Sequence, residues 1–209
     1  MEVGQKFPLT IKRLGINGEG VGFYKRNVVF VKGAIPGEEV TVKLTKVSPK
    51  FAEAEILTIR KASEFRQEAP CSVYAECGGC QLQHMTYEAQ LINKRDIVVQ
   101  AFEKFAKEIG ETTEIRQTLG MEDPWNYRNK SQFQVRKDGK RVYAGLFSEG
   151  SHQLLNINDC LVQQPLTTKI TVAVRKILQK LNITIYDGKS LNGLVRTIVV
   201  RTGLNLNQY

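Results

Sequence analysis

The sequence Cys71-Ser72-Val73-Tyr74-Ala75-Glu76-Cys77-Gly78-Gly79-Cys80 holds three of the four cysteines of this 209-residue chain. The fourth, Cys160, lies far downstream. A short loop can direct three thiolates at one point, and a distant element can complete the set. Four thiolates suit a tetrahedral zinc ion or a 4Fe–4S cluster. The glycine pair within the loop supports a metal site, because a backbone that curls around a metal needs residues without a Cβ.

Other uses of the four cysteines compete with a metal site. Two disulfides would consume all four, but no apolar signal segment opens the chain, so we expect a reducing, cytoplasmic location. Scattered buried thiols are a further alternative, although chance would seldom place three of the four so close together. Zinc sites usually pair two Cys-x-x-Cys knuckles, and this chain has one. Three clustered cysteines with one remote cysteine are commoner among iron–sulfur proteins.

The composition is that of an ordinary globular protein, with 42% hydrophobic and 24% charged residues and a formal net charge of +9. No apolar run is long enough to span a bilayer, so we expect no membrane partner. Residues 1–66 carry net +5, residues 67–124 net −5 and residues 125–209 net +9. Two basic segments around an acidic one suggest separate units and a polyanionic partner, although a generally basic protein would give the same total.

Residues 4–61 predict a small all-β unit. Five short strands separated by turn signals fit a closed OB-like barrel, a fold that often binds nucleic acid. The predicted strands are Phe7–Leu14, Gly20–Tyr24, Val28–Val31, Glu39–Lys46 and Ala52–Arg60. Basic residues near the turns, with Phe23, Tyr24 and Phe51 among them, suit base stacking and phosphate contact. A core position explains each aromatic at least as well.

The rest of the chain predicts a mixture of helix and strand. A helix is expected from Thr86 to Ile109, with an apolar stripe that forms a packing face. A hairpin follows, with strands at Ser131–Arg136 and Val142–Phe147 around the turn signal Asp138-Gly139. We also expect a strand at Gln153–Ile157 that leads to Cys160, a helix at Thr167–Leu181 and a strand at Leu194–Arg201. The fold class is therefore mainly β with α+β, and the predicted domains are 1–64 and 65–209.

Several motifs of the chain form a recognisable set. The cysteine block, which continues through Gln81-Leu82-Gln83-His84, is the most specific of them. The others, in chain order, are Gly18-Glu19-Gly20-Val21-Gly22, Tyr87-x-x-Gln90-Leu91-x-x-Lys94, Tyr127-Arg128-Asn129-Lys130 and Asp159-Cys160. Together they resemble the iron–sulfur-containing family of RNA uracil-5-methyltransferases. The resemblance covers essentially the whole chain.

The resemblance implies an RNA-binding TRAM barrel followed by a central domain with a 4Fe–4S cluster held by Cys71, Cys77, Cys80 and Cys160. It implies S-adenosylmethionine only for a third, C-terminal domain, which supplies a cysteine nucleophile and a glutamate base. The chain shows no such domain, and residues 204–209 carry nothing that marks a natural end. We therefore expect an N-terminal portion, inactive alone, with no catalytic or S-adenosylmethionine-binding residue. Among RNAs, the resemblance favours ribosomal RNA, of the 23S type, over transfer RNA.

For RNA contacts the sequence offers basic residues near predicted turns and one histidine beside the cysteine block: Lys12, Arg13, Lys25, Arg26, His84, Arg128, Lys130 and Arg136. Each alone is more often a solvated surface group. Three other functions stay open. These are a non-enzymatic RNA-binding module with a structural zinc, a radical S-adenosylmethionine enzyme that leaves Cys160 idle, and an electron-transfer protein.

Overall fold

The computed structural model describes residues 1–203, so residues 204–209, in which the sequence shows no mark of a natural end, lie outside the described residues. The chain divides into two compact units. The barrel unit comprises Met1–Ala69 and Gln81–Gly120, and the cysteine unit comprises Pro70–Cys80 and the residues from Met121 onward. This division differs from the predicted domains 1–64 and 65–209, because residues 81–120 lie with the barrel. The separation into an RNA-binding domain and a cluster domain stays a prediction.

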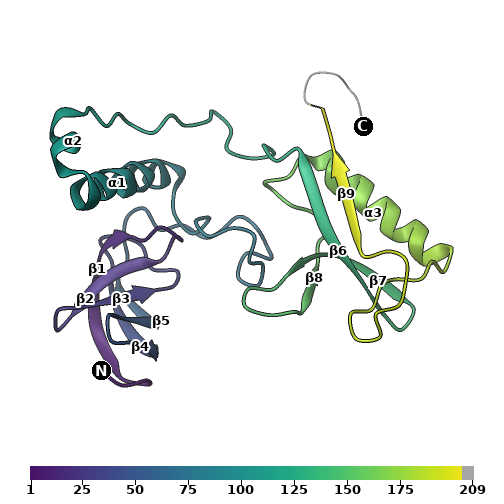
Figure 1. Ribbon diagram of the computed structural model, residues 1–209, viewed down its shortest axis with the longest axis horizontal. Coiled ribbons are helices and arrows are strands. Elements are labelled where there is room, and N and C mark those ends of the chain that lie inside the picture. The colour runs from purple at the N-terminus through teal and green to yellow at the C-terminus, as the bar shows by residue number, and fades with distance from the viewer. Residues whose placement is uncertain (204–209) are drawn as a thin grey trace. The chain divides into compact units, whose positions relative to one another are not determined.

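Five strands close into a barrel in the order β1-β2-β3-β5-β4, which confirms the predicted five-stranded barrel. Side chains alternate between core and solvent along β1, as expected of a strand with one buried face. The core consists mainly of small and branched apolar residues from β1, β3, β4 and β5, including Ile11, Val29, Val42 and Ala52, and Tyr24 of β2 packs against it. The strands are β1 (Lys6–Leu14), β2 (Gly20–Tyr24), β3 (Asn27–Val31), β4 (Glu39–Val47) and β5 (Phe51–Lys61) (Figure 1).

The helix that completes the barrel unit is shorter than predicted. Helix α1 (Tyr87–Phe105) begins after Thr86, whose side chain accepts a hydrogen bond from the Ala89 amide, as expected of an N-cap. It ends at Ala106, where φ is −150°, and a short helix α2 (Lys107–Thr112) follows. The expected helix 86–109 is therefore two helices, because the backbone at Ala106 is not helical. Ala89 packs with Met85, Leu14 and Ile35, whereas Phe105 is 78% exposed.

The cysteine unit is a four-stranded antiparallel sheet with one helix against it. The strand order is β8-β7-β6-β9. The predicted hairpin is present, and Gly139 in its turn has φ +54°, a value that glycine adopts easily. Its core joins the inward residues of the sheet to Ile170, Val174 and Leu178 of the helix. The elements are β6 (Lys130–Asp138), β7 (Arg141–Phe147), β8 (Leu154–Asn156), β9 (Thr197–Arg201) and α3 (Pro165–Lys180) (Figure 1).

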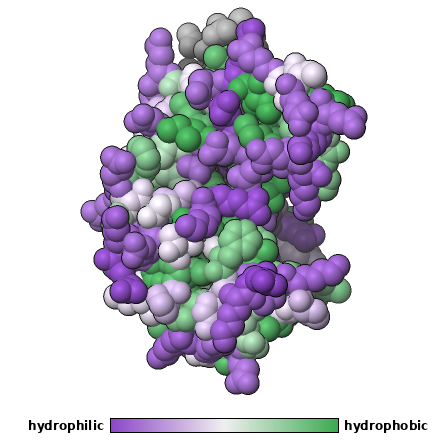
Figure 2. All heavy atoms as spheres, turned by 90° about the vertical axis from the view of Figure 1, so that its left-hand side faces the viewer, coloured by the Kyte–Doolittle hydropathy of each residue, from purple (hydrophilic) through white to green (hydrophobic). Residues whose placement is uncertain are grey.

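Figure 2 shows one face on which hydrophilic side chains predominate, with hydrophobic areas between them. Among the helices within residues 1–203, none combines the length and apolar character that crossing a membrane would require.

Candidate functional site

All four cysteines lie in the cysteine unit and are half-buried free thiols. Residues 71–77 form consecutive turns, in which the Tyr74 amide donates to the Cys71 carbonyl and the Cys77 amide to the Val73 carbonyl, at 3.0 and 2.8 Å. Cys77 also forms an antiparallel bridge with Ser148, just after β7. The loop is thereby held against the end of the sheet.

The two glycines of the loop occupy crowded positions. A Cβ at residue 79 would lie 3.2 Å from Leu146 Cδ1 and 3.3 Å from Cys77 Sγ. A Cβ at residue 78 would lie 3.3 Å from the Glu149 Cα. Such contacts are tighter than ordinary van der Waals contact, so a larger residue at either position would require its neighbours to shift. That these glycines let the backbone curl around a metal stays a prediction.

Cys160 packs against the same core as Val73 of the loop. Burial raises the pKa of its thiol, the Val162 and Gln163 amides oppose that rise, and the charges of Cys80 and Cys71 add to it. Burial likewise raises the pKa of the Cys77 thiol. The hydrogen bond from the Gly79 amide acts to lower this pKa, and the charges of Cys80 and Cys71 act to raise it further. Cys71 and Cys80 therefore influence both Cys77 and Cys160, although Cys160 is remote in sequence.

The four thiols do not form a compact site for a single metal ion. Within residues 1–203, no three His, Cys, Asp or Glu side chains are grouped closely enough to hold one ion. A zinc ion requires its sulfur ligands at about 2.3 Å from one centre. In a 4Fe–4S cluster each thiolate binds a different iron, so the four sulfurs stand further apart. Free thiols and nearby amide donors fit such a group, and its presence stays a prediction.

Arg175 of α3 positions the segment before Cys160. Its guanidinium donates to the side-chain carbonyl of Asn156 and, at 2.9 Å, to that of Asn158. The Asn156 oxygen also accepts from the Ala144 amide of β7. Burial lowers the pKa of Arg175. This contact was not predicted, because it joins residues whose proximity depends on the packing of α3.

The predicted RNA contacts of the barrel unit fall into three places. Lys12 and Arg13 are exposed on β1, and Arg13 donates to the Gln100 side chain of α1. Lys25 and Arg26 form the exposed β2–β3 turn, with φ of +48° and +68°. The β1–β2 register places these two pairs toward opposite ends of that hairpin. His84 is only 8% exposed, so a direct contact with RNA would require it to leave the interior.

The aromatic residues of the barrel divide between surface and packing. Phe23 is 50% exposed. The Tyr24 ring stacks on Phe7 with centroids 3.8 Å apart, and Lys25 Nζ lies 5.5 Å from the Tyr24 centroid. Phe51 packs edge to face against Phe30 at 5.7 Å. Of the three predicted stacking residues, Phe23 is therefore the most accessible to a base.

The predicted contacts in the cysteine unit lie at and before β6. Arg128 and Lys130 are exposed. Arg128 is fixed through its backbone, since its amide donates to the Val162 carbonyl and its carbonyl accepts from the Gln164 amide, both at 2.9 Å. Arg136 is half-buried, and its guanidinium carbon lies 5.6 Å from the centroid of Phe147.

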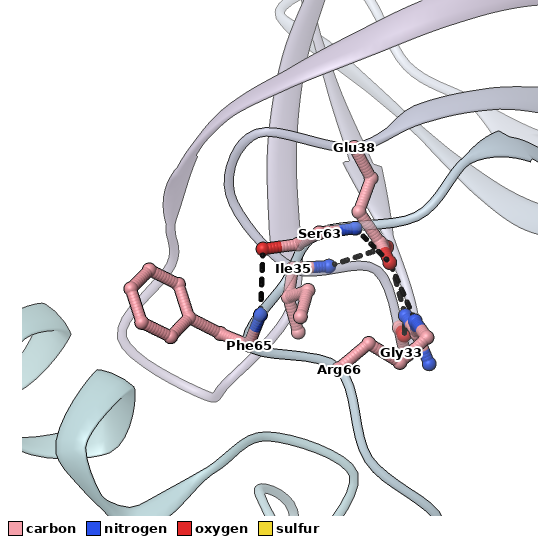
Figure 3. Close-up of polar contacts among 6 residues, drawn as sticks. All are labelled: Gly33, Ile35, Glu38, Ser63, Phe65 and Arg66. Atoms are coloured by element: carbon pink, nitrogen blue, oxygen red, sulfur yellow. Dashed lines mark hydrogen bonds and ion pairs between the residues drawn. The ribbon is translucent and has the colours of Figure 1, made fainter.

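A buried ion pair in the barrel unit was not predicted from the sequence. Glu38 is completely buried, and both its carboxylate oxygens accept from Arg66 (Figure 3). The Ile35 amide donates to the carboxylate at 3.0 Å, and Arg66 donates to the Gly33 carbonyl at 2.7 Å. Burial acts to raise the pKa of Glu38, but the bonds from Arg66 and from the Ile35 and Ser63 amides outweigh burial and lower it.

The segment around Arg66 pairs with the segment around Met85, and these two segments lead into and out of the cysteine loop, residues 70–80. Arg66 forms an antiparallel bridge with Met85. The Gln67 amide donates to the His84 carbonyl at 3.0 Å, and the Thr86 amide donates to the Phe65 carbonyl at 2.9 Å. Residues 70–80 are therefore a closed loop on a paired stem that belongs to the barrel unit.

Comparison with known proteins gives matches along the whole chain. Residues 1–57 match the family described as the TRAM domain. An uncharacterized RNA methyltransferase of Bacillus anthracis is 58% identical over 208 residues, which are 100% of this chain and 45% of that protein. One from Halalkalibacterium halodurans is 51% identical over 208 residues, again 100% of this chain and 45% of the relative. The chain thus spans less than half the length of these curated relatives.

A solved structure shares the fold at low sequence identity. It is the tRNA (uracil-54, C5)-methyltransferase of Pyrococcus abyssi, in complex with S-adenosyl-L-homocysteine. The TM-score is 0.68 at 21% identity, with 96% of this chain and 44% of that chain covered. At this identity the similarity concerns the fold.

Proposed function

We propose that the chain is the RNA-binding and cluster-bearing portion of an S-adenosylmethionine-dependent RNA uracil-C5 methyltransferase. The TRAM match and the relatives named RNA methyltransferase support a place among RNA methyltransferases. A neighbour in fold that methylates uracil C5 of transfer RNA supports the choice of base and atom. Because the curated relatives are more than twice as long, methyl transfer is proposed for the whole protein.

The observation that carries the proposal is that Cys160 and Val73 of the cysteine loop pack against the same core within one unit. A TRAM barrel alone does not require it. Cys71, Cys77, Cys80 and Cys160 would hold a 4Fe–4S cluster, which bound there would tie the loop to the end of β8. Since a preformed site rarely exists in an unfolded chain, binding such a group stabilises the folded unit. The role is therefore structural.

The proposed RNA is ribosomal, and basic residues from both units are proposed to contact it. Those in the barrel unit are Lys12, Arg13, Lys25 and Arg26, and those in the cysteine unit are Arg128, Lys130 and Arg136. His84 is not retained among the proposed RNA contacts, because its side chain is buried. Lysine and arginine contacts to phosphate give affinity that falls with salt.

The proposal is tested by deleting the gene from its host and measuring 5-methyluridine in separated ribosomal and transfer RNA. We expect 5-methyluridine to disappear from one position of ribosomal RNA and to return with the wild-type gene. Complementation with a Cys160→Ser variant should restore less of it, since the cluster would be lost. Unchanged 5-methyluridine in both RNAs would contradict the proposed reaction, and loss from transfer RNA alone would contradict the proposed substrate.

A further inference from the structure

The sheet of the cysteine unit has one face covered by α3 and one face free of it. Phe133 and Val135 of β6 are completely buried in the core that includes α3. Because side chains alternate along a strand, the residues between them point to the other side. The strand register extends this second side over three strands. We call it the open face, and it carries Lys130, Gln132, Gln134, Arg136, Tyr143, Phe147, Thr197, Val199 and Arg201.

The open face carries positive charge in an arrangement that costs stability. Lys130 of β6 and Arg201 of β9 stand directly opposite each other in the register, and both are exposed. Like charges directly opposite on neighbouring strands are destabilising. In the part of the chain that the structure describes, no carboxylate forms an ion pair with either residue. A polyanion bound across the pair would remove the repulsion.

Aromatic and amide side chains lie beside these charges. Tyr143 stands opposite Arg136, whose guanidinium lies over the Phe147 ring. Gln132 is exposed, and Gln134 shares a 3.5 Å hydrogen bond with Thr197 on the neighbouring strand. Aromatic rings and arginine planes stack on unpaired bases, and side-chain amides bond to base edges. The face therefore offers groups for the bases as well as for the phosphates.

The dimensions of the open face suit a short single strand. Seven residues of β6 extend over about 20 Å, and the three strands are about 10 Å across between the outer two. Sheets of similar size stack two or three bases in RNA-binding proteins. A flat sheet cannot enter the deep, narrow major groove of an RNA duplex, and its aromatic rings reach only bases that are unstacked.

We propose that the open face binds a single-stranded segment of RNA, with Lys130 and Arg201 on phosphates and Tyr143 and Arg136 against bases. The inference rests on the proposed function and adds a defined subsite to it. It commits to unpaired RNA because positive charge, aromatic rings and side-chain amides occur together there, a combination that suits phosphates and base faces.

The test compares variants of the full 209-residue chain in binding a fluorescein-labelled, unstructured uridine-rich RNA and a duplex of the same length. One variant carries Lys130→Gln with Arg201→Gln. The matched control carries Lys169→Gln with Lys176→Gln, which removes two exposed charges from α3. We expect the first variant to bind the single strand about tenfold or more weakly, with its salt slope reduced by about 1.4, for two lost phosphate contacts. The control should change affinity less than about threefold.

Two further readouts separate binding from folding. Lys130→Gln alone should raise the urea midpoint of unfolding while weakening binding, a combination that a purely structural role would not give. Tyr143→Ala should bind at least about fivefold more weakly, and Tyr143→Phe should bind as the wild type does, because stacking needs only the ring.

The possible failures are distinguishable. If the wild-type chain binds neither RNA, the RNA partner in the proposed function is wrong and the inference falls with it. If the wild type binds RNA but the open-face variants match the α3 control, only the inference is overturned. A change in self-association with unchanged RNA binding would assign the face to a second copy and would also overturn it.

Discussion

Glu38 is a single buried residue that joins two separate segments of the barrel unit. Its carboxylate has no exposure, and its partners come from the β3–β4 connection and from the segment after β5. Removing one partner of a buried ion pair leaves an uncompensated charge. The resulting loss of folding free energy is larger than the net stabilisation that the intact pair provides. The two residues therefore hold the stem of the cysteine loop to the barrel.

We expect Arg66→Ala to lower the free energy of unfolding by about 3 kcal/mol, because it leaves Glu38 buried without a cation. Urea unfolding followed by circular dichroism measures this change. Arg116→Ala is the control, since the Glu114–Arg116 pair is 74–81% exposed. An exposed pair contributes about 0–1 kcal/mol. Equal losses in the two variants would contradict the assigned role of Glu38.

The pKa of Glu38 predicts a dependence of stability on pH. Its pKa in the folded chain is below the ordinary value of 4.5. A lowered carboxyl pKa contributes stability that is present above the unfolded-state value and is lost as the pH falls through the folded-state value. Wild-type protein should therefore lose more stability than Glu38→Gln when urea unfolding is compared near neutral pH and below about pH 4. Parallel losses would contradict this account.

At the scale of elements, Gly20 shows why the β1–β2 hairpin needs glycine. A Cβ there would lie 2.7 Å from the Ala34 carbonyl oxygen, a contact with backbone that cannot easily move. Gly20→Ala should therefore destabilise the barrel by about 1–3 kcal/mol, measured by urea unfolding. Gly188→Ala, where nothing lies within 4 Å, is the control and should be neutral or slightly stabilising. Equal effects would show that the contact is relieved at no cost.

The contact of α3 with the segment before Cys160 predicts a second effect at this scale. Without the hydrogen bonds that Arg175 donates to Asn156 and Asn158, the segment before Cys160 should open more often. Arg175→Ala should therefore increase the rate at which iodoacetamide alkylates Cys160 in metal-free protein, measured by mass spectrometry. Lys176→Ala, an exposed neighbour on the same helix, should leave the rate unchanged. An equal rate in both variants would remove Arg175 from the positioning role.

Periodic elements were predictable from sequence, and features that depend on tertiary contact were not. The strands of the barrel and the hairpin at Asp138-Gly139 follow from alternation and turn residues. The interruption at Ala106 did not, since alanine favours helix and the apolar stripe continues beyond it. Buried pairs such as Glu38 and Arg66 leave no periodic signal, because each residue alone looks like a surface charge. The burial of His84 was missed for the same reason.

At the scale of the molecule, the cysteine loop connects two compact units through its covalent ends. The stem around Arg66 and Met85 belongs to the barrel unit, and residues 70–80 belong to the cysteine unit. The sequence predicted the four cysteines as one set from their spacing, and the structure places them in one unit. It did not predict that α1 lies with the barrel, because that packing depends on Leu14, Ile35, Met85 and Ala89 meeting in three dimensions.

The most direct measurement is the content of iron, acid-labile sulfide and zinc in protein purified without oxygen. A 4Fe–4S cluster on Cys71, Cys77, Cys80 and Cys160 predicts about four irons and about four sulfides per chain, with little zinc, and their loss in Cys160→Ser. About one zinc per chain without iron, or full iron retention in Cys160→Ser, would contradict it.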